Sequence, residues 1–140
     1  MSLSNEDIKL FKEPLIAHET AFGADYYLFG KEMYVVSLPK YDTVNDEIVK
    51  FGYDFLERHK ISYHHSIFIL NTFTDIAKNV RDWAADALKI RLTYSDAIVL
   101  KDSGQKILTD FYVKQQLPAW PTQIFFDLKS ALDWSVQQKK

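Results

Sequence analysis

The chain has 140 residues, of which 47% are hydrophobic and 26% charged, as is typical of one folded soluble domain and not of a disordered or membrane-embedded chain. Its 17 Lys and Arg residues are scattered among 19 Asp and Glu residues, and the formal charge is -2, which argues against nucleic acid as a partner. Cysteine is absent, which excludes disulfides, thiolate nucleophiles and cysteine-ligated metal sites.

The first 23 residues leave two structures open. Their apolar residues could form a short helix or an extra edge strand; these residues are Ile8, Leu10, Phe11, Leu15 and Ile16. The segment lacks the basic start and apolar core of a secretory signal, and no apolar run in the chain approaches the roughly 20 residues of a membrane span. We therefore expect one cytoplasmic domain over residues 1–140, with residues 1–23 as an extension and no membrane span.

Two aromatic and β-branched runs follow, and they predict a hairpin. Tyr26–Phe29 and Met33–Val36 flank the short turn Gly30-Lys31-Glu32, and strands separated in this way pair antiparallel. The edge at Tyr26–Phe29 could join a second copy in a homodimer, unless the N-terminal extension covers it.

A helix is predicted next. Thr43 and Asp46 have the spacing of a capping box, with Asp in place of Glu. Apolar residues then recur at helical intervals up to about His59; they are Val44, Ile48, Phe51 and Phe55.

The second half alternates strands with helices. Ser66–Asn71 and Ala97–Leu100 are short apolar runs, typical of strands buried on both faces of a parallel sheet, and the first of them is expected at its centre. Helical spacing appears over residues 80–88 and 103–117. A last strand, Gln123–Phe126, leads to Asp127 as N-cap of a closing helix with the apolar stripe Leu128, Ala131, Leu132 and Val136. The predicted fold is α/β: a mostly parallel sheet with an antiparallel N-terminal hairpin, flanked by about four helices.

Three stretches carry an ordered set of motifs. Ile67–Asn71 leads to Thr74-Asp75-Ile76 and Val80-Arg81-Asp82-Trp83; Ser95–Leu100 is followed by Phe111-Tyr112; Pro118–Phe125, with its Pro-Thr-x-x-Phe pattern, precedes Ala131-Leu132-Asp133-Trp134. Over about residues 24 to 138, this set resembles the SpoIIAA-like branch of the STAS superfamily, in particular its small stand-alone bacterial domains. The predicted element order agrees with the fold of that family.

The resemblance implies a binding function. Domains of this family are mostly not enzymes and bind protein partners such as anti-sigma factors, and their architecture is similar to that of SEC14-type lipid-binding domains. Where the phosphorylated relatives have Ser or Thr at the start of the helix after the central strand, this chain has Ala77-Lys78-Asn79, with Thr72 and Thr74 just upstream. Phosphorylation at the family's usual position is therefore not expected.

The candidate binding site lies in the segment after the central strand. Ligands meet parallel α/β sheets at the carboxyl ends of strands, which favours four polar residues there; they are Thr74, Asp75, Lys78 and Asn79. Tyr112 and Trp120 stand near a loop bracketed by two prolines and could form a partner patch. The alternatives are that the polar residues are ordinary turn and cap residues, and that Trp120 belongs to the core.

The remaining motifs do not indicate chemistry. His64 and His65 are adjacent at the start of a strand, so their side chains should point to opposite faces and cannot share one metal ion without a bulge. One of them could bind a metal with His18 or His59, but no ligand spacing supports this. The four glycines match neither the spacing of the Walker phosphate-binding loop nor that of the dinucleotide-binding fingerprint. The Gly-x-Ser-x-Gly motif of serine hydrolases is absent. We expect a non-catalytic module without a cofactor or metal, which binds a protein partner. The alternative is a carrier of an apolar small molecule in a SEC14-like pocket.

Overall fold

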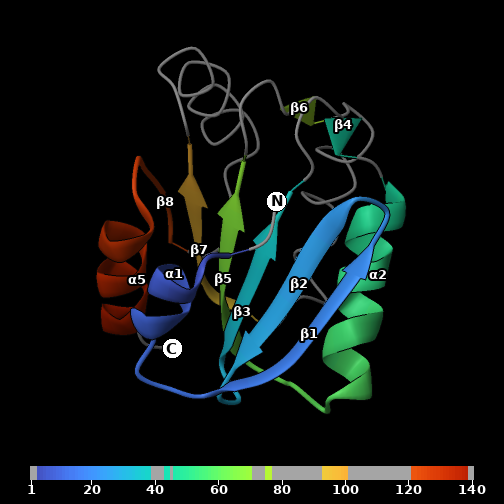
Figure 1. Cartoon of the computed structure of the whole chain (residues 1–140), viewed down its shortest axis with the longest axis horizontal. Coiled ribbons are helices and arrows are strands. Elements are labelled where there is room, and N and C mark those ends of the chain that lie inside the picture. Colours follow the sequence, from blue (N-terminus) through green and yellow to red (C-terminus); the bar gives the residue numbers. More distant parts are fainter. Residues whose placement is uncertain are drawn as a thin grey trace.

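The computed structural model describes residues 3–38, 43–44, 46–70, 75–76, 93–100 and 121–138. These residues form a mixed six-stranded sheet, a small two-stranded sheet and three helices. Helix α2 lies over one face of the large sheet, and helices α1 and α5 lie over the other (Figure 1). The α/β class predicted from the sequence is confirmed.

The large sheet joins an antiparallel and a parallel half. Its strand order is β1-β2-β3-β5-β7-β8, antiparallel from β1 to β3 and parallel from β3 to β8. The strands are β1 Leu15–Ala21, β2 Ala24–Phe29, β3 Met33–Ser37, β5 His64–Ile69, β7 Thr93–Val99 and β8 Thr122–Phe125. The predicted hairpin is the pair β2 and β3, and the predicted central strand is β5, which lies between β3 and β7.

Both structures left open for residues 1–23 occur, one after the other. Helix α1 (Asn5–Lys9) begins at a capping box in which Ser4 and Asp7 bond each other's backbone N–H. Strand β1 then pairs with β2 from Leu15 to Ala21, with a register shift between Leu15 and Ala17. The N-terminal extension therefore covers the edge of β2 at Tyr26–Phe29, which was the condition under which that edge would not join a second copy.

Helix α2 begins later than predicted. It spans Asp46–Arg58, while Thr43 and Val44 form strand β4 (Thr43–Val44). This short strand pairs in parallel with β6 (Asp75–Ile76), near the carboxyl ends of β3 and β5 (Figure 1). The residue directly before Asp46 holds the N-cap position, and Thr43 stands three residues before Asp46, so the predicted cap at Thr43 is wrong. The rest of the stripe is confirmed, since Ile48 and Phe55 are buried.

The closing helix α5 (Leu128–Gln137) begins as predicted, because the Asp127 side chain accepts a hydrogen bond from the backbone N–H of Ser130 (2.7 Å). Its buried stripe differs by one position. Ser135 is fully buried, whereas Val136 is 46% exposed. The helix thus turns a small polar residue toward the sheet and leaves the larger apolar one in solvent.

Two hydrophobic cores fill the two faces of the sheet. The first packs α2 onto one face, with Tyr26, Tyr34 and Phe55 as its largest side chains. The second lies under α1 and α5 and includes Phe11, whose ring stacks on that of Phe29 with a centroid distance of 3.8 Å. The helices predicted over 80–88 and 103–117 lie outside the described residues. The described part of the chain contains three helices, α1, α2 and α5.

Candidate functional site

The site predicted from the sequence falls almost wholly outside the described residues. This applies to Thr74, Lys78, Asn79, Tyr112 and Trp120, and to Thr72. The backbone of Asp75 is described, and it pairs with that of Thr43 in the β4–β6 ladder. Strand β6 (Asp75–Ile76) lies near the carboxyl ends of the central strands (Figure 1), and the binding role of the segment stays a prediction.

The adjacent histidines at the start of β5 face opposite sides of the sheet, as expected. The His64 ring meets that of Tyr34 edge-on, with centroids 5.8 Å apart, in the core under α2. His65 Nδ1 lies 3.0 Å from Ser95 Oγ on β7. The two imidazoles are therefore separated by the sheet.

The pair of His65 and Ser95 has the composition of a nucleophilic dyad, but its surroundings argue against that role. Both residues are buried, Ser95 completely, and a nucleophile must reach its substrate. The neighbouring Thr93 hydroxyl lies 3.1 Å from the carbonyl oxygens of both His64 and Ser95. The hydrogen bonds of this cluster join the amino ends of β5 and β7. The cluster therefore stabilises the sheet.

A second polar cluster is more accessible and lies on β1 and β2. His18 Nε2 is 3.0 Å from Asp25 Oδ1, and the Thr20 hydroxyl donates to the same oxygen at 2.7 Å. The His18 ring also stacks on that of Tyr27, with centroids 4.3 Å apart and planes within 2°. The Asp25 side chain is 7% exposed and the His18 side chain 39%. A buried carboxylate thus orients a histidine that solvent can reach.

The Asp25 carboxyl is expected to make the free energy of unfolding depend on pH. Burial acts to raise the pKa of this carboxyl, but hydrogen bonds from Thr20 and His18 outweigh it, and the net pKa is lowered. A lowered pKa stabilises the native state above the pKa of the unfolded chain, and this stabilisation is lost as the pH falls below about 4. Urea unfolding should show the stability difference between the native chain and Asp25→Asn shrinking from pH 7 to pH 3. A difference that stays constant would contradict this.

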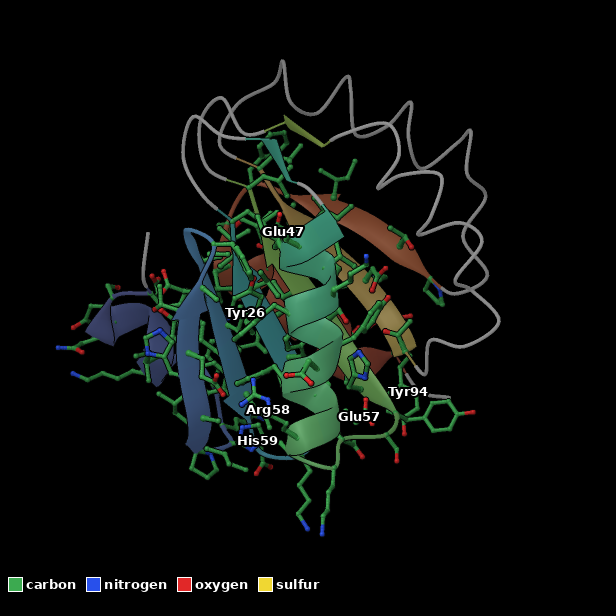
Figure 2. The ribbon with its side chains drawn as sticks, turned by 90° about the vertical axis from the view of Figure 1, so that its right-hand side faces the viewer. Tyr26, Glu47, Glu57, Arg58, His59 and Tyr94 are labelled. Atoms are coloured by element: carbon green, nitrogen blue, oxygen red, sulfur yellow. The ribbon has the colours of Figure 1, made fainter. Side chains whose placement is uncertain are left out.

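The opposite face of β1 carries an ion pair with α2. Arg58 bonds Glu19 through both terminal nitrogens, at 2.8 and 3.1 Å, and its Nε bonds Asp54 at 2.8 Å. The hydrogen bonds from Arg58 lower the pKa of Glu19. Figure 2 shows Arg58 and His59 at the carboxyl end of α2, beside the hairpin strands. The pair fastens the end of α2 to the outermost strand.

Strand β1 forms one edge of the large sheet. Within the described ranges it pairs with β2 only. Three large apolar side chains around its start are exposed, Leu10 at 37%, Leu15 at 39% and Ile16 at 52%. An edge strand presents a row of backbone donors and acceptors to solvent, and here Leu15 and Ile16 at its start add exposed apolar side chains.

The described part of the chain offers neither a cluster of metal ligands nor a membrane-spanning helix. No group of three or more His, Asp or Glu side chains in this part of the chain could hold a metal ion. None of the described helices is long and apolar enough to cross a membrane.

The chain matches the model of one protein family. Residues 47–139, more than half of its length, match the model of a domain of unknown function, DUF7793. The chain belongs to this family. No curated protein and no solved structure matches it significantly. The match begins within α2 and ends beyond α5, so the strands β1, β2 and β3 precede the matched region.

Proposed function

We propose that the chain is a non-catalytic binding module that takes up an extended segment of a protein partner at the edge of β1. The observation that carries the proposal is the edge itself: β1 is seven residues long and, among the described residues, pairs on one side only. An extended peptide satisfies such an edge with its own backbone, which supplies affinity, while side chains supply specificity.

The edge strand is held rigid from both faces. On one face Arg58 donates two hydrogen bonds to Glu19. On the other, Asp25 and the Tyr27 ring fix His18. A strand that is already extended and immobile loses little conformational entropy when a partner pairs with it, which favours binding.

The exposed apolar side chains at the start of β1 suit a partner that contributes hydrophobic side chains there. Leu10, Leu15 and Ile16 are exposed around the amino end of β1, whereas its later residues His18, Glu19 and Thr20 are polar. A segment with an apolar residue toward the start of β1 fits this surface. The opposite edge strand, β8, has four residues and offers a shorter ladder.

The resemblance to SpoIIAA-like domains supports a regulatory role in the cytoplasm of a bacterium through such a partner. The alternative, a carrier of an apolar small molecule, needs space between the sheet and its helices. Under α2 that space holds Tyr26 and Phe55, both fully buried. The described core therefore favours a protein partner.

The test places a photo-crosslinking residue at Ile16 in the organism that encodes the chain, with the same residue at Val136 as control. Both positions are about half exposed, but Val136 lies on α5. We expect a protein crosslinked from position 16 only. A synthetic peptide covering the crosslinked segment should bind the purified chain, and Ile16→Lys should weaken it roughly tenfold, because lysine on an edge strand opposes strand addition.

The control variant Val136→Lys should bind the peptide like the native chain. Crosslinking that is equal at both positions, or absent from both, would overturn the proposal. Native mass spectrometry of the purified chain tests the carrier alternative. A small added mass that is lost on denaturation would support a carrier.

A further inference from the structure

The imidazole of His18 is fixed in one orientation. Its Nε2 bonds Asp25, whose carboxylate is itself held by the Thr20 hydroxyl. One ring face lies on Tyr27, and the Tyr27 hydroxyl in turn accepts a hydrogen bond from the backbone N–H of Leu3 (2.8 Å). Rotation of the ring would break the bond to a buried carboxylate, so the orientation is strongly preferred.

This orientation decides which nitrogen is nucleophilic. A carboxylate only accepts hydrogen bonds, so His18 Nε2 carries the proton and Nδ1 of the neutral ring keeps its lone pair. A carboxylate bonded to one ring nitrogen fixes the tautomer and the orientation of the ring. No hydrogen bond to Nδ1 is found in the described part of the chain, and 39% of the side chain is exposed.

We propose that His18 is a phosphoryl-acceptor site, modified at Nδ1 by a phosphoryl donor of the phosphoramidate class. The Nδ1 lone pair forms the new N–P bond, while the P–N bond of the donor breaks and ammonia leaves with the electron pair. The Nε2 proton stays in its hydrogen bond to Asp25. The negative carboxylate stabilises the positive charge that develops on the ring.

The chain contains a matched histidine for comparison. The His59 side chain is 32% exposed, close to the value for His18, but its Nε2 is 3.9 Å from the nearest oxygen of Glu19, beyond hydrogen-bond distance. His64 and His65 are buried. A difference in reactivity between His18 and His59 therefore reports on the short hydrogen bond to a carboxylate and not on exposure.

The experiment treats the full chain with potassium phosphoramidate at neutral pH. Peptide mass spectrometry gives the rate at each histidine, and ³¹P NMR distinguishes the two ring nitrogens. We expect His18 to react at Nδ1 about tenfold faster than His59, the low end of the effects seen when such supporting carboxylates are removed. Equal rates at the two histidines, or reaction of His18 at Nε2, would overturn the proposal.

Two variants test the role of the carboxylate. In Asp25→Asn the new amide can donate to Nε2 and shift the proton to Nδ1, so the His18 rate should fall to that of His59. Thr20→Val retains the carboxylate and its charge, removes only the hydroxyl that positions it, and should slow His18 several-fold. The His59 rate should not change in either variant, which serves as a check that each is folded. A His18 rate unaffected by both substitutions would also overturn the proposal.

Discussion

Replacing Phe55 by alanine is expected to lower the free energy of unfolding by about 3–5 kcal/mol, the usual cost of removing a buried aromatic ring. Phe55 is fully buried where α2 meets the sheet. Its ring centroid lies 6.2 Å from that of Tyr26 and 6.1 Å from that of Tyr34. These large rings belong to the sheet and cannot collapse into the vacated space, so a cavity should remain. Urea unfolding followed by circular dichroism measures the loss.

Phe126 provides the control for this prediction. It is 52% exposed just after β8, so Phe126→Ala removes the same atoms without opening a cavity. A change within about 0.5 kcal/mol is expected, as for most surface substitutions. A similar loss in both variants would show that the core under α2 is not tightly packed around Phe55.

The central part of the fold follows from hydrophobic pattern alone. The runs at Tyr26–Phe29, Ser66–Asn71 and Ala97–Leu100 are apolar on nearly every position because both faces of the sheet are covered. The N-cap at Asp127 was equally clear, since an acidic residue stands directly before a helical stripe. In these cases local sequence preference and tertiary packing agree.

Two errors arose where tertiary structure overrides a local pattern. Thr43 has the spacing of a cap, but pairing with Asp75, distant in sequence, draws it into β4. In α5 the helical stripe suggested that Val136 is buried, yet the neighbouring Ser135 faces the core. A small side chain allows the end of α5 to approach the sheet closely, and hydropathy alone does not indicate this.

The cluster at His18 was missed because the turn before β2 has an unusual sequence. Phe22 and Gly23 both have positive φ, 54° and 78°, as a two-residue hairpin loop requires. Asn or Asp is the common first residue of such loops, and Phe obscures the signal. Had the loop been recognised, its register would have placed His18 opposite Tyr27 and beside Asp25. The residues at the predicted site lie almost wholly outside the described ranges.

Gly52→Ala is expected to destabilise the chain although it improves helix propensity. A Cβ at Gly52, inside α2, would meet the hydroxyl of Tyr34, whose side chain is buried in the core below. Overpacking of this kind costs about 1–3 kcal/mol, against a gain of up to about 1 kcal/mol from replacing glycine in a helix. With the full propensity gain, the expected net loss is up to about 2 kcal/mol in urea unfolding.

The same substitution should reverse its sign when the hydroxyl is absent. In Tyr34→Phe the nearest ring atom would be Cζ, 3.4 Å from the new Cβ, which is an ordinary contact. Gly52→Ala should then be neutral or should stabilise the chain by up to about 1 kcal/mol, because only the propensity gain remains. The double-mutant cycle isolates this coupling, since both single changes are compared with the pair. Equal losses in both backgrounds would mean that the close approach of α2 to Tyr34 does not determine the choice of glycine.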